Sequence, residues 1–141
     1  MRISTKGRYS LEALLCMALL PPGEYASTRA IAAATGISDG YLEQLFIPLR
    51  RAGMLKGVRG PQGGYTLSRD AADITVGAVL RAVEGPLNPA VCADPCPEEA
   101  RCRSRYTWTE LYREINGCVD SITMADLTEA YAALDQIEYT I

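Results

Sequence analysis

The sequence contains no histidine among its 141 residues. A histidine general base is therefore excluded, and a metal bound here lacks the commonest nitrogen ligand. The chain also lacks a Gly-Lys-Ser/Thr phosphate loop, a C-x2-C pair, an internal repeat and a long uninterrupted apolar run. These absences argue against a nucleotide-binding enzyme, a typical zinc site and a membrane protein.

The longest apolar run, "LEALLCMALL" at residues 11–20, follows several basic residues and loosely imitates a secretory signal. Glu12 interrupts it, and its spacing instead predicts one face of an amphipathic helix. That face consists of Leu11, Leu14, Leu15, Ala18 and Leu19. We therefore expect a cytoplasmic protein with no role at a membrane. A structural disulfide is not expected there, and the odd number of five cysteines agrees.

The net charge of −3 is unevenly distributed along the chain. Residues 1–70 hold nine Lys/Arg against five Asp/Glu, whereas residues 71–141 hold five against twelve. A basic front half beside an acidic back half indicates that the front half contacts phosphate. Because 48% of the residues are hydrophobic, the chain can bury the core of one ordinary domain.

Residues 27–53, "STRAIAAATGISDGYLEQLFIPLRRAG", predict two short helices joined by a tight turn. Ser27 can cap a helix that runs to about Thr35, Gly36 suits a left-handed turn, and Ser38 can cap the second helix. This is the pattern of a helix-turn-helix, whose second helix can enter a DNA major groove. A helical hairpin that binds no DNA is the alternative that this stretch leaves open.

The next segment, "MLKGVRGPQGGYTLSR", predicts a β-hairpin with a slim, positively charged tip. Two β-prone runs, Leu55–Val58 and Tyr65–Leu67, flank a Gly/Pro-rich turn that carries Arg59. A glycine-rich phosphate loop is the competing interpretation, but the strand–loop–helix frame is missing. A helix-turn-helix followed by a basic hairpin predicts a winged-helix domain and binding to double-stranded DNA.

The predicted DNA contacts fall into three groups. Gln44 can bond an adenine edge, Glu43 can accept from cytosine, and Arg59 should enter a minor groove. Residues near helix starts are expected on phosphates, and the glycines of the wing allow a close backbone approach. The complete set is Lys6, Arg8, Ser27, Thr28, Ser38, Tyr41, Glu43, Gln44, Arg50, Arg51, Arg59, Gly60, Gly63 and Gly64.

A packed helix is predicted over residues 74–85, followed by an aperiodic loop and a longer helix. The apolar residues of the longer helix are spaced 3-4-3-4, the alternation of a seam between two helices: Trp108, Leu111, Ile115, Cys118 and Ile122. The seam can pack within the chain, but we favour a homodimer, because winged helices commonly read palindromic operators as dimers. A last helix should begin at Thr123, where Thr123 and Asp126 form a capping-box pattern and Met124, Leu127, Tyr131 and Leu134 an apolar face.

The expected fold is mainly α with a small β-hairpin: a winged helix-turn-helix DNA-binding domain plus a long dimerisation helix. Residues 1–85 form the DNA-binding domain, and residues 86–105 form a cysteine-containing sensor loop. Residues 106–141 form the dimerisation helix, the C-terminal helix and the tail.

The loop "CADPCPEEARC", residues 92–102, holds three of the five cysteines. A zinc site normally uses four closed ligands and a C-x2-C pair, which this loop does not offer. The residues alone favour a thiol switch and an iron–sulfur site equally. Cys16 and Cys118 lie on apolar helical faces, so we expect both to be buried structural thiols.

"MRISTKGRYSLEALL", "GYLEQLF", "VRGPQGGY" and the cysteine loop together resemble the Rrf-two family of bacterial regulators, over essentially the whole chain. The resemblance implies a dimeric winged-helix transcription factor rather than an enzyme. By likeness to the family's IscR-like members it also implies an iron–sulfur cluster of the 2Fe-2S type on Cys92, Cys96 and Cys102. The histidine that completes the ligand set in those members is Arg105 here, and the N-terminal acid used by NsrR-like members is absent. The fourth ligand therefore stays open among Asp94, Glu98, Glu99, an exogenous thiol and water.

A second resemblance within the family points to a different regulator. "RAVEGPLNPA" and the tail "QIEYTI" are similar to CymR-like members, which are cysteine-metabolism repressors without a cluster. This resemblance implies that cysteine synthase binds the C-terminal tail through Ile141. An ordinary frayed tail is the competing interpretation.

Overall fold

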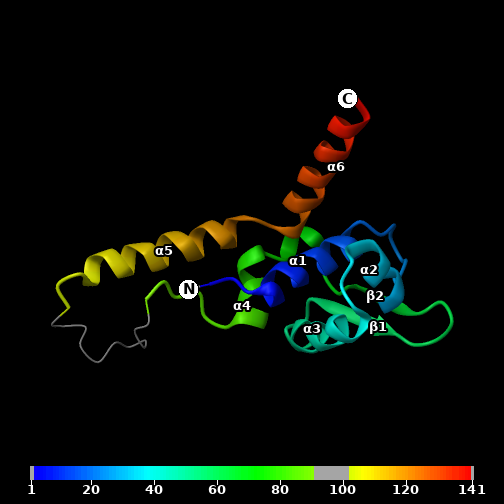
Figure 1. The fold of residues 1–141 in the computed structure, drawn as a ribbon, viewed down its shortest axis with the longest axis horizontal. Helices are drawn as coiled ribbons and strands as arrows, with labels where there is room; N and C mark the ends of the chain where they lie inside the picture. Colours follow the sequence, from blue (N-terminus) through cyan, green and yellow to red (C-terminus); the bar gives the residue numbers. More distant parts are fainter. Residues whose placement is uncertain (1, 91–101, 141) are drawn as a thin grey trace.

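The computed structural model describes residues 2–90 and 102–140 of the chain. Its elements are α1 (Thr5–Ala18), α2 (Thr28–Thr35), α3 (Asp39–Arg51), β1 (Leu55–Val58), β2 (Gly64–Leu67), the 3-10 turn η1 (Ala71–Asp73), α4 (Val76–Glu84), α5 (Arg105–Ser121) and α6 (Met124–Thr140). Helices α1 to α4 and the hairpin form one body, from which α5 runs away and α6 leaves at a steep angle (Figure 1). The predicted fold class is confirmed.

Helix α1 lies at the centre of the core. Ser4 caps it, because its Oγ accepts from the Lys6 amide at 3.2 Å. The inward face buries Ala13, Leu14 and Met17 against apolar side chains of α2 and α3. Each large apolar side chain removed from water contributes about 1.5–3 kcal/mol. The predicted stripe is wrong at its last residue: the helix ends at Ala18, and Leu19 is 46% exposed.

Helix α2 begins and ends at the predicted residues, and α3 begins at the predicted one. The Oγ of Ser27 accepts from the Ala30 amide at 3.0 Å, and that of Ser38 from the Tyr41 amide at 3.3 Å. Gly36, between the helices, has a φ of +76°, the left-handed conformation that glycine adopts without a steric penalty. The helix-turn-helix is therefore fixed by local residues.

The hairpin pairs β1 with β2 in antiparallel register, with Leu55 opposite Leu67 and Val58 opposite Gly64. Ala26 forms an isolated antiparallel bridge beside β2, because its N–H and C=O both bond the backbone of Tyr65. Gly64 has a φ of +150°, and a Cβ there would overlap the Ala26 carbonyl. A glycine at this position is thus required by the sheet itself.

Helix α4 is attached to α1 by the carboxylate of Glu84. Its Oε1 accepts from the amides of Ser4 and Gly7, both at 2.9 Å, and from the Ser4 hydroxyl at 2.5 Å. Burial disfavours the charged form, but these hydrogen bonds and the nearby Lys6 outweigh it and lower the pKa of Glu84 below its ordinary value of 4.5. The carboxylate therefore satisfies orphan amides at the α1 N-terminus from another helix.

Helices α5 and α6 meet at the predicted capping box. The Thr123 amide donates to Asp126 Oδ2 at 2.9 Å, and the Asp126 amide donates to Thr123 Oγ1 at 3.1 Å. The same corner is tied to the start of α4, since the Met124 amide donates to the Ile74 carbonyl at 2.8 Å. Met124 is fully buried, whereas Tyr131 and Leu134 of the predicted apolar face are 50% and 61% exposed.

We predict that Glu84→Gln lowers the free energy of unfolding at pH 7 by roughly 1–3 kcal/mol, the usual cost of leaving such donors without a charged acceptor. Because the folded-state pKa is lowered, the contribution of Glu84 is fully present above its ordinary pKa and is lost as the pH falls through the lowered value. Denaturant unfolding of both proteins at several pH values measures this difference. The exposed Glu12, replaced by Gln, is the control. If the difference in unfolding free energy between Glu84→Gln and the parent stays constant down to pH 3, the prediction is contradicted.

Candidate functional site

Helix α3 turns a polar strip to solvent because its apolar residues are used in the core. Leu42, Leu45, Phe46 and Leu49 are buried, while Glu43, Gln44, Ile47, Arg50 and Arg51 are exposed. Glu43 and Gln44, the predicted base-reading residues, therefore lie together on the outer face. Ile47 is 59% exposed on this face and is absent from the predicted set. The signal for it is an apolar residue one turn beyond Glu43 and Gln44.

Tyr41 joins the start of this strip to α1. Its hydroxyl lies 3.3 Å from Thr5 Oγ1, and its ring packs edge-on against Tyr9 with centroids 5.7 Å apart. The side chains of Lys6 and Arg8, on the same first turns of α1, are exposed. Lys6 and Arg8, the predicted phosphate-contacting residues, therefore lie on a helix that packs against the first turn of α3.

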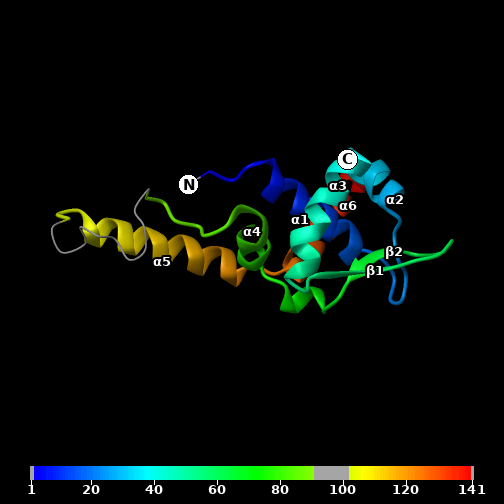
Figure 2. The same ribbon diagram turned by 90° about the horizontal axis from the view of Figure 1, so that it is seen from below.

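The wing extends beyond the helical body, with Arg59 and Gly60 exposed near its tip (Figure 2). The Tyr65 ring of β2 lies 4.6 Å from the Phe46 ring of α3 and fixes the hairpin against that helix. Gly63 and Gly64 have structural reasons to be glycine, because a Cβ on either would overlap backbone atoms. Ser27 is exposed at the α2 cap and Thr28 is half-buried beside it.

The three loop cysteines are only partly placed, since Cys92 and Cys96 lie outside the described residues. Cys102 is a free, half-buried thiol just before α5. Its Sγ lies 3.5 Å from Ser104 Oγ. Within residues 2–90 and 102–140 no group of three or more His, Cys, Asp and Glu side chains is arranged to hold a metal.

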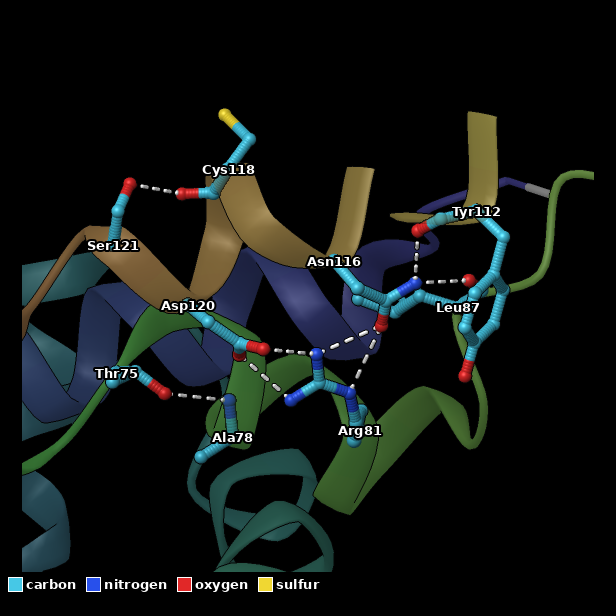
Figure 3. A network of polar contacts seen from close by, with 9 residues as sticks. All are labelled: Thr75, Ala78, Arg81, Leu87, Tyr112, Asn116, Cys118, Asp120 and Ser121. Atoms are coloured by element: carbon cyan, nitrogen blue, oxygen red, sulfur yellow. Dashed lines mark hydrogen bonds and ion pairs between the residues drawn. The ribbon is translucent and has the colours of Figure 1, made fainter. Parts of the chain in front are cut away.

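The two remaining cysteines differ in their surroundings. Cys16 is half-buried against the core, and this burial raises the pKa of its thiol. Cys118, which we expect to be buried within the seam, is exposed in the single chain. Its side chain points away from α4 (Figure 3), and among the described residues none buries it.

The predicted seam of α5 divides into two parts. Trp108 and Leu111 are 40% and 41% exposed, and no described segment of the chain covers them. Ile115 is half-buried, and Ile122 packs against the chain's own cluster of Val76, Leu80 and Leu87. Ile122 also lies just past the end of α5. Its packing is therefore intramolecular, while the outer part of the seam is open.

The family model Rrf2, described as an iron-dependent transcriptional regulator, matches residues 3–130. The chain belongs to the Rrf2 family. It is 40% identical over 129 residues to the HTH-type transcriptional regulator IscR of Serratia proteamaculans, covering 90% of this chain and 79% of that protein. It is 42% identical over 130 residues to IscR of Photobacterium profundum, covering 90% and 75%.

Solved structures give the same assignment. CymR, the global cysteine regulator of B. subtilis, has a TM-score of 0.80 and 36% identity, covering 92% of this chain and 98% of its own. IscR of T. potens has a TM-score of 0.75 and 36% identity, covering 93% and 88%. These relatives are regulators rather than enzymes, and the winged-helix prediction is confirmed. No described helix is long and apolar enough to cross a membrane.

In this Rrf2 chain a polar network joins α4 to α5 (Figure 3). Arg81 forms a two-pronged ion pair with Asp120, each bond 2.8 Å long, and also donates to Asn116 Oδ1 at 2.8 Å. The hydrogen bonds between them raise the pKa of Arg81 and lower that of Asp120. Asn116 in turn donates to the Leu87 carbonyl at 3.0 Å, at the start of the predicted sensor loop.

Sequence reasoning missed this junction, although one signal was present. Gly77 lies inside α4, where a glycine costs about 1 kcal/mol relative to alanine and usually has a packing reason. A Cβ at Gly77 would overlap the Asp120 carboxylate and press on Val119. The glycine therefore lets α5 approach α4 closely enough for the ion pair to form.

For DNA binding, we predict that Arg59→Ala weakens binding to a selected operator by roughly 1–3 kcal/mol, the range for one specific contact. Lys6→Ala should instead weaken binding to all DNA similarly, because phosphate contacts carry no sequence information. Gel-shift titrations at fixed salt, with operator and scrambled duplexes, separate the two effects. Arg113→Ala on α5 is the matched control and should change neither. If Arg59→Ala leaves the operator affinity unchanged, the wing is not part of the DNA interface.

Proposed function

We propose that this Rrf2 protein is a homodimeric regulator of transcription that reads a palindromic DNA site and senses an iron–sulfur cluster. Cys92, Cys96 and Cys102 would hold the cluster. The observation that carries this proposal is the position of the three cysteines, between the winged domain and the helix whose apolar face is open. A change at such a position can alter how two DNA-binding domains are held.

The donor set fits an iron–sulfur cluster by its chemistry. Three thiolates are the ligands such clusters prefer, and clusters tolerate a different ligand at one iron. Cys102, the described member, is a free thiol and is not closed in a disulfide. Because the chain has no histidine, the fourth ligand would be an oxygen donor or a small thiol. When bound, the cluster supplies a group that responds to oxidants, nitric oxide or iron supply.

The exposed strip of α3 would lie in the major groove. Gln44 can read adenine, Glu43 can accept from cytosine, and Ile47 can contact a thymine methyl group. Arg59 at the wing would enter the adjacent minor groove, and Lys6 and Arg8 would contact phosphates. The remaining predicted residues would contact the backbone near the helix caps and the wing: Ser27, Thr28, Ser38, Tyr41, Arg50, Arg51, Gly60, Gly63 and Gly64.

Coupling between the loop and DNA would pass through the α4–α5 junction. Leu87 lies near the start of the loop, and its carbonyl accepts a hydrogen bond from Asn116. Arg81 bonds both Asn116 and Asp120. A cluster favours the arrangement of helices in which its ligands are best placed, and it shifts the population toward that arrangement. The spacing of the two recognition helices in a dimer would change accordingly.

Dimer formation is supported by the open apolar face of α5, and α6 exposes further large apolar side chains. Monomeric proteins rarely expose large apolar patches, which commonly mark a protein–protein interface. The exposed side chains are Tyr106, Trp108, Leu111, Tyr112, Tyr131 and Leu134. A second copy of α5 packed along this face would also cover Cys118.

To test the dimer, we predict that Leu111→Glu yields a monomer that keeps its helical content but loses palindromic binding. The helix should persist because Leu111 is 41% exposed and leaves no cavity in the core. Sedimentation at micromolar concentration and circular dichroism measure the two properties. Thr109→Glu, two residues earlier on α5, is the matched control and should remain dimeric. A parent chain that sediments as a monomer refutes the proposed dimer.

To test the cluster, we predict that protein purified without oxygen, or reconstituted with iron and sulfide, is brown and contains stoichiometric iron. Replacing Cys96 with alanine should abolish the colour, whereas Cys16→Ala and Cys118→Ala should keep it. Visible absorption and iron counting measure the outcome. A colourless parent protein without iron excludes cluster sensing.

The second candidate function is a CymR-like regulator without a cluster, favoured by the TM-score of 0.80 to the B. subtilis cysteine regulator. Its proposed partner is cysteine synthase, bound by the tail that ends at Ile141, which lies outside the described residues. Capture of that enzyme by the intact chain, and not after deletion of Ile141, would support it. If the protein binds iron, and the intact chain and the chain lacking Ile141 capture the enzyme equally, the cluster-sensing function is favoured.

A further inference from the structure

Ser104 occupies the N-cap position of α5 but does not use its side chain as a cap within the described structure. A capping serine normally accepts from an amide of the first turn and so stabilises the helix. Here the Oγ instead accepts from Nε1 of Trp108 at 2.8 Å, and it lies 3.5 Å from Sγ of Cys102. The hydroxyl is therefore directed between an indole and a thiol.

The chemistry of the three groups determines the direction of these hydrogen bonds. An indole N–H can only donate, so Ser104 must be the acceptor toward Trp108. A cysteine that binds iron does so as a thiolate and carries no hydrogen. The single hydrogen of the Ser104 hydroxyl can then point only toward the sulfur if both contacts are kept. Trp108 thus leaves Ser104 oriented as a donor to Cys102.

We infer that Ser104 is a positioning residue for the Cys102 ligand and that Trp108 holds it in place. This inference rests on the proposed cluster. A hydrogen bond to a ligand sulfur stabilises the more negative, reduced cluster and so raises its reduction potential. Because Trp108 is also part of the open apolar face of α5, the same contact links the ligand to the proposed dimer interface.

The first measurement uses cluster-free protein. The chain has one tryptophan, so its side chain gives a single indole N–H resonance and a single source of indole fluorescence. Ser104→Ala should shift that resonance upfield, as expected when its acceptor is lost, while Ser104→Thr should keep it near the parent position. A resonance that does not move in Ser104→Ala overturns the inference.

The second measurement is a redox titration of the reconstituted cluster in the parent and three variants. Ser104→Ala should shift the potential to more negative values, and Ser104→Thr should restore it. Trp108→Phe should shift it in the same direction by less, because the hydroxyl remains but loses its orientation. A merely structural role for Ser104 would lower stability and leave the potential unchanged.

The outcomes separate this inference from the proposed function. If the parent chain binds no iron, both the proposed cluster-sensing function and the inference about Ser104 are wrong. If the parent binds a cluster but Ser104→Ala titrates at the same potential, the inference alone is overturned. A lower potential in Ser104→Ala with recovery in Ser104→Thr supports it, since threonine retains the hydroxyl.

Discussion

The ion pair between Arg81 and Asp120 is the contact on which the arrangement of this molecule depends. Its two side chains are 35% and 45% exposed, and an exposed pair usually contributes 0–1 kcal/mol. Its importance is geometric, because the planar guanidinium bonds both carboxylate oxygens and Asn116 at once, which fixes the rotation of α5 against α4. Gly77 provides the close approach that this geometry needs. On its other side, α4 holds the α1 N-terminus through Glu84. One short helix thus sets the positions of both the DNA-binding body and the α5 arm.

The two described ends of the predicted sensor loop both contact α5 or its N-cap residue. Leu87 is bonded by Asn116, and Cys102 contacts Ser104, which accepts from Trp108. Trp108 and Asn116 are eight residues apart, about 12 Å along a helix that rises 1.5 Å per residue. A change in the shape of the loop would therefore act on a defined stretch of α5. Because Arg81 bonds the same Asn116, that change would reach α4 without passing through the core.

The sequence predicted those parts of the fold that local chemistry determines. Ser27, Gly36, Ser38 and Thr123 signal helix ends through their own side chains or backbone freedom, and all four lie where expected. Contacts between distant residues were not predictable in this way. Glu84 bonds Ser4 across 80 residues and Arg81 bonds Asp120 across 39, and no local pattern records such a pairing. The α5 seam was predicted as one stripe, but a periodic stripe cannot say which of its residues face the chain's own core. Ile122 does, and Trp108 and Leu111 do not.

The uneven charge explains how a protein of net charge −3 can bind DNA in one orientation. The exposed basic residues Lys6, Arg8, Arg50, Arg51 and Arg59 lie on α1, α3 and the wing, whereas α6 exposes the acidic residues Asp126, Glu129 and Asp135. Phosphates are attracted to the first group and repelled by the second, so an encounter is productive mainly when the wing side faces the duplex. A low overall charge also limits the counterion-driven binding that is independent of sequence. We propose that discrimination between sites then comes from the α3 strip and the wing.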